Sequence, residues 1–390
     1  MTTLDTLRST VADVDLDAIT ANIAAIRERA KADVIAVVKA DAYGHGAEAV
    51  AETSFEAGAV MVAVATVEEG LALREGGVNG PILVFFGATD SSEVAHAVAQ
   101  DLILTVWDVD RARAISEAAA TLRRTARVHF KVDTGLTRLG APAHEAAARL
   151  REISALGRIE VDGIFTHFAT ADDPDTSNDQ AQLAKFREVL GTIRDRPRLV
   201  HAAASAGVAA FGAMDGVNAV RPGLAIYGVH AAPHLAAALE LRPALTWHSR
   251  VHRIASVPKG TGVSYGHEYR LPRDGRIATV PVGYGDGLPR VAGTRGGVLV
   301  RGHRIGFAGR VCMDLVMLDV TEIDGAREGD EVVLIGAQAG AKQTADDLAA
   351  ACGTISYEIL TGIRRRVPRR YFRGGKQVAT RTLAEGYRAR

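Results

Sequence analysis

The sequence predicts an α/β protein in which an N-terminal (β/α)8 TIM barrel is followed by a mainly antiparallel β domain. Through the first two thirds of the 390 residues, short β-rich runs alternate with amphipathic stretches rich in Ala, Glu and Arg, at the spacing of one strand–helix unit. After about residue 235 this alternation stops, and short strand-like segments separated by glycine, proline and aspartate follow one another. That pattern is typical of antiparallel β structure. A chain of this length is more than one hydrophobic core usually organises, which favours two domains.

Eight β-rich runs account for the barrel. They are VIAVV from Val34, VMVAVATV from Val60, ILVFF from Ile82, LILTVW from Leu102, VHFKV from Val128, VDGIFTHF from Val161, RLVHAAA from Arg198 and GVNAVR from Gly216. Eight parallel strands, each followed by a helix, close a TIM barrel. A doubly wound open sheet is the structural alternative. We favour the barrel because such a sheet usually uses fewer strands over this length.

Three ranges are expected along the chain. Residues 1–12 form an N-terminal segment that pairs with the β domain, because STVADVDL is strand-like and precedes the barrel. Residues 13–238 form the barrel and residues 239–390 the β domain, with the border near the proline-containing HAAPHLAAALELRPAL. The strands of the β domain are expected in TWHSRVHRIASV, GRIATVPVGYGDG, GGVLVRGHRIGFAGRVCMDLVMLDV and EVVLIG.

Composition excludes several classes of protein. Lys and Arg number 46, as do Asp and Glu, so a large basic surface for nucleic acid or an anionic membrane is not expected. The N-terminus lacks the apolar core of a signal peptide, and no apolar run is long enough to span a bilayer. Two cysteines are too few for a disulfide framework. His248 and His252 are too far apart along a strand to bind one metal, and we predict no metal site. We therefore expect a cytoplasmic protein.

Lys39 is the first candidate for chemistry. In VIAVVKADAYGHGA an apolar strand delivers this lysine at its C-terminal end, before a loop that carries Tyr43 and His45. Barrel catalysis occurs at this end of the strands. A lysine preceded by apolar residues loses its proton more easily and can form a Schiff base. A surface lysine on a loop is an equally good reading of this stretch taken alone.

A second stretch, HFKVDTGLTRLG, places charges on another barrel strand. Lys131 and Asp133 alternate along it, and Arg138 lies beyond a turn at Gly135. Charged residues inside a barrel need partners, so a buried ion pair is one interpretation. The other is that Arg138 holds an anion at the mouth of the barrel.

The ends of the last three barrel strands carry further polar residues. His167 follows a strand in FTHFATAD, where a lone histidine is more often a core residue than a catalyst, and Arg221 ends a strand in AVRPGLAIYG. Barrels often bind phosphate through backbone N–H groups in the loops after strands seven and eight. The residues that fit this position are Ser205, Gly223 and Leu224. In the β domain Tyr265, Tyr284, Met313 and Tyr357 lie in loops or short motifs, and none is convincing alone.

Together these motifs closely resemble those of alanine racemases, the fold-type III enzymes that depend on pyridoxal 5′-phosphate (PLP). The resemblance runs from about Val14 to Tyr371. Its motifs, in the family's order, are VVKADAYGHG, KVDTGLTRLG, THFATAD, VRPGLAIYG, VSYG, GYGDG, GRVCMD and ISYE. The first is the signature around the cofactor lysine and is highly specific.

The resemblance implies a role for each matching residue. Lys39 forms a Schiff base with PLP and is one catalytic base, and Tyr265, supplied by the partner subunit, is the base on the opposite face. Arg221 contacts the pyridine nitrogen, and Lys131 matches a lysine that is often carbamylated in this family. The cofactor-binding residues are Lys39, Tyr43, Arg138, His167, Ser205, Arg221, Gly223, Leu224 and Tyr357. The substrate-binding residues are Arg138, Met313, Tyr265 and Tyr284.

The implied function is that of an isomerase, a homodimer with shared active sites that interconverts L- and D-alanine by a two-base mechanism and supplies D-alanine, a peptidoglycan precursor. A racemase that prefers serine or another small amino acid, and a fold-type III decarboxylase, are alternatives. The Gly-rich phosphate segment and Cys-Asp pair of such a decarboxylase do not appear in the expected form. A non-enzymatic PLP carrier and a cofactor-free Schiff-base aldolase are more distant alternatives. Ala204 stands where the family usually has Asn, which puts substrate preference in doubt, and His267 is a candidate for lowering the pKa of Tyr265.

Overall fold

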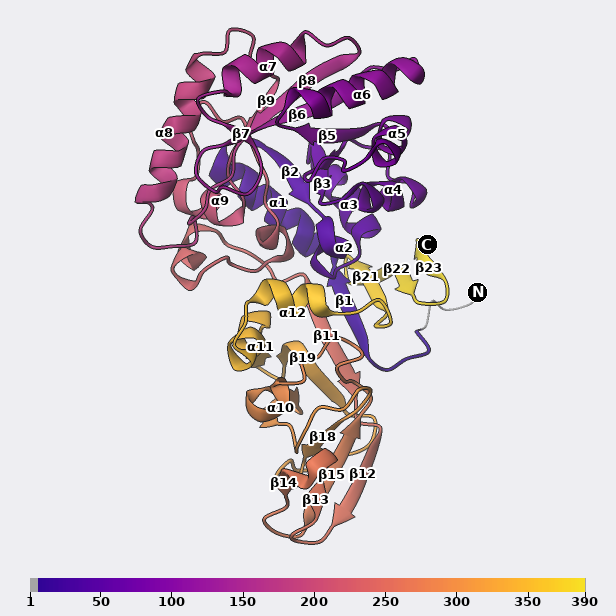
Figure 1. Ribbon diagram of the computed structural model, residues 1–390. Helices are drawn as coiled ribbons and strands as arrows, with labels where there is room; N and C mark the ends of the chain where they lie inside the picture. The colour runs from indigo at the N-terminus through magenta and orange to yellow at the C-terminus, as the bar shows by residue number, and fades with distance from the viewer. Residues whose placement is uncertain (1–5, 390) are drawn as a thin grey trace. The chain divides into compact units, whose positions relative to one another are not determined.

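The computed structural model describes residues 6–389, and the chain separates into two compact units (Figure 1). The barrel unit comprises Ala18–Ala42 and Ala47–Arg242, and the β unit comprises Met1–Asp17, Tyr43–Gly46 and Pro243–Arg390. Part of the N-terminal segment expected over 1–12, residues 1–5, lies outside the described residues. The domain ranges 13–238 and 239–390 stay a prediction.

The barrel unit contains a closed ring of eight parallel strands, as the sequence predicts. In ring order they are β2 (Asp33–Val37), β3 (Met61–Val64), β4 (Ile82–Val84), β5 (Leu102–Val106), β6 (Ala126–Asp133), β8 (Ile159–Phe165), β9 (Leu199–His201) and β10 (Ala219–Val220), which returns to β2. The short β7 (Ala141–Pro142) pairs beside β6. Each of the eight β-rich runs supplies one of these strands, so the TIM barrel is confirmed and the open sheet is wrong.

Helices cover the outside of the barrel (Figure 1). They are α1 (Leu16–Ala30), α3 (Ala47–Glu56), α4 (Val67–Glu75), α5 (Ser91–Ala99), α6 (Val109–Thr121), α7 (Ala146–Ser154), α8 (Ser177–Gly191) and α9 (Ser205–Phe211), followed by the 3-10 helices η1 (Leu224–Tyr227) and η2 (Pro233–Ala238). Side chains cap several helices: Thr66, Asp90 and Asp108 accept hydrogen bonds at the starts of α4, α5 and α6. Because helices pack on one side and the barrel interior on the other, every residue of β3, β4 and β5 is buried.

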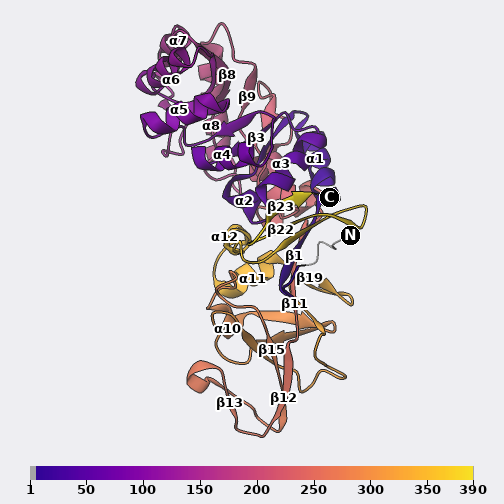
Figure 2. The ribbon, with the colours of Figure 1, turned by 90° about the vertical axis from the view of Figure 1, so that its right-hand side faces the viewer.

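The β unit is mainly antiparallel and is seen from the side in Figure 2. Its large sheet has the order β17 (His303–Gly306), β16 (Gly297–Val300), β19 (Glu331–Gln338), β11 (Leu245–Arg250), β1 (Val11–Asp15), β21 (Arg369–Arg373), β22 (Lys376–Thr382) and β23 (Gly386–Ala389), with β20 (Ala341–Gln343) beside β19. The N-terminal strand β1 lies inside this sheet, antiparallel to β11 and parallel to β21. Trp247 and Tyr371, both fully buried, come from strands on either side of β1.

Smaller elements complete the β unit. An antiparallel sheet joins β12 (Arg253–Val257), β15 (Gly275–Val280) and β18 (Val316–Asp319), and β13 (Gly262–Val263) pairs with β14 (Tyr269–Arg270). The helices are α10 (Ala292–Arg295), α11 (Ala345–Cys352) and α12 (Ser356–Gly362). Among residues 6–389, no helix combines the length and apolar composition that crossing a membrane requires.

Candidate active site

Lys39 lies two residues beyond the end of barrel strand β2, at the start of an unusual turn. The turn α2 (Lys39–Tyr43) is left-handed: Ala40, Asp41 and Ala42 have φ of 50°, 57° and 52°, and Tyr43 has φ of 52°. Each L-residue in this conformation costs about 1–2 kcal/mol. Consecutive strained residues persist only where their surroundings hold them, and they cluster at functional sites.

Two carboxylates hold this turn within the barrel unit. Glu69 Oε1 accepts a hydrogen bond from the Ala40 N–H at 2.6 Å, and its Oε2 accepts one from the Ala65 N–H at 2.7 Å. Asp41 Oδ1 accepts one from the Ala47 N–H at 3.1 Å. The carboxylate that caps α4 therefore also fixes the backbone directly after Lys39.

Cationic side chains gather around the ends of the barrel strands. Burial, and after it Arg138, lower the pKa of Lys39, whereas Glu69 acts in the opposite direction. On β6, Lys131 is only 6% exposed. Burial, followed by Arg221 and Arg138, lowers the pKa of Lys131 to about 8. Both amines therefore lose their protons more easily than an ordinary lysine does.

Arg221, directly after β10, is the best-anchored of these cations. It is 2% exposed, and its Nη2 donates to the carbonyls of Thr166 and Ala202 at 2.7 and 2.6 Å and contacts His167 Nδ1 at 2.9 Å. Burial, together with Arg138, lowers the pKa of Arg221 to about 9, which leaves the guanidinium charged at neutral pH. Burial and Arg221 hold the pKa of His167 well below its usual value, so this ring is neutral.

Ser205 organises the backbone after the seventh and eighth barrel strands. Its Oγ accepts hydrogen bonds from the N–H groups of Gly223 and Ala225, both at 3.0 Å, which fixes the start of η1 at Leu224. Ala204 is the N-cap of α9 and makes no side-chain hydrogen bond there. Ser205 and the Gly223–Leu224 backbone are therefore held together where the sequence predicts a phosphate-binding loop, and residue 204 adds no side-chain hydrogen bond there; phosphate binding by this loop stays a prediction.

Two tyrosines implied to bind the phosphate lie together in the β unit. The rings of Tyr43 and Tyr357 are 5.8 Å apart between centroids. Burial, and then Tyr357, raise the pKa of Tyr43, so its hydroxyl stays protonated and can donate a hydrogen bond. Gly44 allows a close approach of the chain here, because a Cβ at this position would lie 2.1 Å from the Leu360 carbonyl oxygen.

Tyr265 and Met313 line a groove on the β unit. Its walls are residues 264–267 and 312–315. In this single chain Tyr265, in η3 (Tyr265–His267), is 71% exposed and Met313 is 53% exposed. Ser264 before the tyrosine has φ of 62° and ψ of −178°, a conformation largely restricted to glycine, and its Oγ donates to the Arg310 carbonyl at 2.8 Å. An influence of His267 on the Tyr265 hydroxyl stays a prediction.

The loop that carries Tyr284 is hydrogen-bonded to the Met313 loop. The Tyr284 N–H donates to the Cys312 carbonyl at 3.1 Å, and the Gly285 N–H donates to the Met313 carbonyl at 2.8 Å. Asp286, fully buried, binds the Gly283 N–H at 3.0 Å and pairs with Arg8 and Arg366. The backbone of Met313 is therefore fixed by an ion-paired aspartate.

Sequence reasoning missed Glu69, Asp286 and His201. Glu69 had a usable signal, because Thr66 and Glu69 have the spacing of a capping box, although nothing in that motif indicates a bond to Ala40. Asp286 lies between glycines in GYGDG, and His201 occupies a barrel strand, where branched apolar residues are usual.

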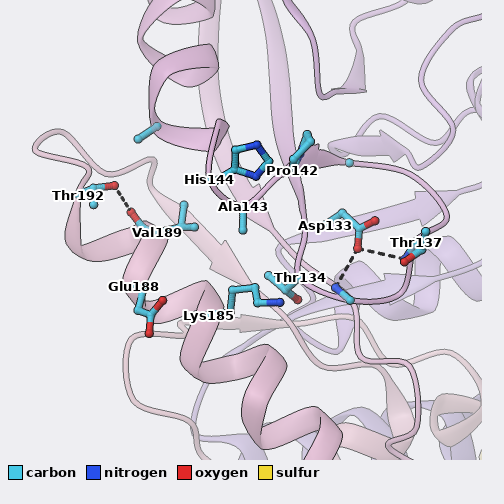
Figure 3. A pocket seen from close by; sticks show the side chains of 13 residues that line it. Asp133, Thr134, Thr137, Pro142, Ala143, His144, Lys185, Glu188, Val189 and Thr192 are labelled. Carbon is cyan, nitrogen blue, oxygen red and sulfur yellow. Dashed lines mark hydrogen bonds between the residues drawn. The ribbon is translucent and has the colours of Figure 1, made fainter.

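A separate cavity of about 680 Å³ lies on the barrel unit beside α8 (Figure 3). It is lined by Asp133, Thr134, His144, Lys185 and neighbouring residues, and the Lys185 side chain points from α8 toward Thr134. Asp133 uses its Oδ1 to accept the N–H groups of Gly135 and Thr137. None of the lysines and arginines gathered at the strand ends lines this cavity, so it is not the candidate site.

The barrel-mouth residues fit a particular class of ligand. The positive charge of Arg138 helps to lower the pKa values of Lys39, Lys131 and Arg221, a repulsion that a ligand carrying anionic groups would relieve. A lysine with a lowered pKa reacts with a carbonyl. The backbone around Ser205, Gly223 and Leu224, after the last two barrel strands, suits a phosphate. This combination defines a Schiff-base-forming barrel enzyme that takes a phosphorylated aldehyde.

The comparisons with known proteins agree with this class. The family described as "Alanine racemase, N-terminal domain" matches residues 14–231, and "Alanine racemase, C-terminal domain" matches residues 244–371. An alanine racemase of Halothermothrix orenii is 43% identical over 93% of this chain and 97% of its own. A Bacillus anthracis alanine racemase with bound L-Ala-P superposes with a TM-score of 0.90 at 36% identity, over 97% of this chain and 99% of that one. A histidine racemase of Leuconostoc mesenteroides superposes with a TM-score of 0.86 at 29% identity, over 95% and 99%.

The chain belongs to the alanine racemase family. It is a PLP-dependent racemase, and therefore an isomerase. These matches favour racemisation over the decarboxylase, the carrier protein and the cofactor-free aldolase.

Proposed function

We propose that this protein interconverts L- and D-alanine by a two-base mechanism, and that it supplies D-alanine in the cytoplasm. The observation that carries the proposal is Lys39, held by a strained turn at the barrel mouth with its pKa lowered by burial and Arg138. The racemase relatives named above support it. Incubation of the PLP-loaded enzyme with single L- and D-amino acids, followed by chiral chromatography, tests the reaction and ranks its substrates.

The residues proposed to hold PLP divide by the part of the cofactor they bind. Lys39 binds its aldehyde carbon, and the charged Arg221 donates to the pyridine nitrogen. The phosphate is held by Tyr43, Ser205, Gly223, Leu224 and Tyr357, while Arg138 and His167 contact the ring side. Because Arg221 remains protonated, it would offer the ring nitrogen a hydrogen bond and not a proton, which disfavours transamination.

Two side chains move the proton that racemisation requires. When bound, PLP withdraws the electron pair left at Cα. Tyr265 Oη removes the Cα proton from L-alanine on one face, and Lys39 Nζ returns one on the other face. Reversal of these roles converts D-alanine, and no rotation of the substrate is needed. The substrate carboxylate is held by Arg138 and the Met313 backbone N–H, and Tyr284 lines the entrance.

The active sites are proposed to be shared between two subunits. Tyr265 and Met313 are largely exposed in one chain although both are assigned to a substrate site, and a second copy would cover them. Such an isologous pair contains two equivalent composite sites. Mixing Lys39→Ala with Tyr265→Ala protein should restore part of the activity through hybrid sites. Absence of recovery despite demonstrated subunit exchange would contradict sharing.

Lys131 is proposed to carry a carbamate. Its amine is buried among cations and has a pKa of about 8, so a substantial neutral fraction can react with CO2. The product is an anion, which would hold Arg138 by charge.

Alanine is the proposed substrate, and serine or another small amino acid is the alternative. The histidine racemase shows that another substrate is compatible with this fold. Ala204 lacks the side-chain hydrogen bond that would stiffen the start of α9, which is the local feature that favours testing the alternative.

A further inference from the structure

A row of polar side chains, each close to the next, runs from Arg221 through the interior of the barrel. Arg221 Nη1 lies 2.9 Å from His201 Nδ1. His201 Nε2 lies 2.8 Å from His129 Nδ1. His129 Nε2 then lies 3.6 Å from Asp162 Oδ2. At the end of the row away from Arg221, Arg198 donates hydrogen bonds to both carboxylate oxygens of Asp162, each at 2.9 Å.

These residues occupy positions that barrels usually fill with apolar side chains. His129 and His201 are fully buried, and Asp162 is 5% exposed. The ring of Phe165 stacks on His201 with centroids 4.6 Å apart and planes 9° apart. Gly163 makes room for His129, because a Cβ there would lie 2.6 Å from the imidazole ring. Burying such polar groups is costly unless each one is satisfied, so their alignment calls for a functional explanation.

The hydrogen bonds from Arg221 to His129 in this row of side chains are all donated in one direction, away from Arg221. A guanidinium only donates, so His201 Nδ1 must accept from Arg221. Burial, followed by Arg221, keeps the pKa of His201 well below its usual value, and burial also lowers that of His129. Each neutral ring therefore carries one proton. His201 carries its proton on Nε2 and donates to His129 Nδ1, which leaves the proton of His129 on Nε2, facing Asp162.

We propose that Asp162 is a positioning residue for Arg221, acting through the tautomers of His129 and His201. At 3.6 Å the carboxylate is beyond hydrogen-bond length from His129, and the described residues give His129 Nε2 no closer partner. It therefore acts by its charge, which stabilises a proton on the nitrogen that faces it. This chain of Asp162, His129 and His201, which we call the relay, keeps His201 Nδ1 unprotonated, so that it accepts the hydrogen bond from Arg221. The inference rests on the proposed function only in that Arg221 is assigned to the cofactor ring.

Arg198 fixes the carboxylate that starts the relay. Its Nε and Nη2 donate to separate oxygens of Asp162 in a two-point fork. His129 and Arg198 hold the pKa of Asp162 far below its usual range, so this carboxylate is ionised at any working pH. Arg198 thus holds the Asp162 carboxylate of β8 from the N-terminal end of β9, opposite the end that leads to the candidate site.

The most informative substitution is Asp162→Asn. The amide oxygen is the only part of asparagine that can accept from Arg198, so the amide NH2 would turn toward His129 and donate to it. That contact moves the proton of His129 to Nδ1 and, in turn, the proton of His201 to Nδ1. The N–H of His201 then faces the N–H of Arg221, and their hydrogen bond is lost. Asp162→Glu, which keeps the charge, should retain the original tautomers.

Asp101→Asn is the matched control. Asp101 also pairs with an arginine, Arg127 of barrel strand β6, at 3.0 Å, but the structure describes no histidine among its partners. This variant loses the same kind of ion pair without touching the relay.

The test uses PLP-loaded protein labelled with ¹⁵N-histidine. Ring-nitrogen NMR assigns the tautomers, with His129→Gln and His201→Gln protein identifying the signals. We expect Nε2–H on both rings in the wild type and in Asp101→Asn, and Nδ1–H on His201 in Asp162→Asn. We also expect kcat to fall about tenfold in Asp162→Asn, the lower end of the loss that follows when a metal-bound histidine loses its outer hydrogen-bond partner, with less than about a twofold change in Asp101→Asn.

Two results would overturn the relay. One is Nδ1–H on His201 in the wild type, which needs no substitution of Asp162 to detect. The other is an unchanged His201 tautomer in Asp162→Asn, which would make the ion pair with Arg198 purely structural. A tautomer change in protein that does not racemise alanine would support the relay and refute the proposed function, so the two failures are distinguishable.

Discussion

The protonation state of Lys131 leads to a quantitative prediction about carbamylation. A pKa of about 8 instead of 10.5 leaves about a quarter of this amine neutral at pH 7.5, against about one part in a thousand for an ordinary lysine. Because only the neutral amine attacks CO2, Lys131 should be favoured over an exposed lysine by roughly 250-fold at that pH. The reaction joins the amine nitrogen to the carbon of CO2 and releases one proton.

The assay is ¹³C NMR of the enzyme in ¹³C-bicarbonate. We expect a protein-bound carbamate signal in the wild type that is retained in Lys185→Gln, where an exposed lysine is removed, and lost in Lys131→Gln. The same Lys131→Gln variant should have a lower kcat/KM, because Arg138 loses its anionic support. A well-ordered, unmodified Lys131 in a crystal structure determined with bicarbonate present would refute this reasoning.

Three further predictions concern stability. In CO2-free apo protein, unfolding takes up protons at Lys131 between pH 8 and 10.5, so the free energy of unfolding rises with pH in that window. Lys131→Met should therefore raise the free energy of unfolding by about 3 kcal/mol below pH 8. Denaturant titrations at increasing pH should show this gain disappearing toward pH 10.5. Ala40→Gly should stabilise the protein by about 1 kcal/mol, because glycine adopts the left-handed conformation without strain. The control Ala114→Gly, within α6, should destabilise it by about 1 kcal/mol, and equal destabilisation by both would contradict the strained turn. Arg221→Lys should lower the free energy of unfolding by about 3 kcal/mol, since buried carbonyl and imidazole acceptors lose donors, and a change below about 0.5 kcal/mol in urea unfolding would mean that these hydrogen bonds contribute little.

The features that sequence could predict are those with a local signal. The β-rich runs from Val34 to Gly216 each became a barrel strand, because buried parallel strands are continuous apolar segments bounded by glycine and polar residues. The positions of Lys39 after such a run, and of Ser205, Gly223 and Leu224 after the last two strands, were predictable in the same way; their roles stay predictions. The resemblance to a known family then supplied roles that no spacing rule contains.

The features that sequence could not predict depend on where strands meet. His129 and His201 lie far apart along the chain, and only the pairing of β6 and β9 with β8 brings their ring nitrogens within 2.8 Å of each other. The bond from Ala40 to Glu69 likewise joins the turn after Lys39 to the first turn of helix α4. The left-handed turn after Lys39 was also hidden, because Ala40 and Ala42 have no preference for that conformation. Composition gives no hint of any of these contacts.

The most direct test of the proposed chemistry is the exchange of the α-proton in deuterated solvent by PLP-loaded Tyr265→Phe enzyme. The substitution removes the proposed base for L-alanine and keeps the ring, so cofactor binding should survive. Tyr284→Phe, the same change at a tyrosine without an assigned proton, is the control and should affect both enantiomers alike. We expect exchange from L-alanine to fall by at least about 100-fold in Tyr265→Phe, with a much smaller loss from D-alanine, whose proton is assigned to Lys39. Equal loss for both enantiomers would contradict the two-base account and would make Tyr265 a residue that positions substrate.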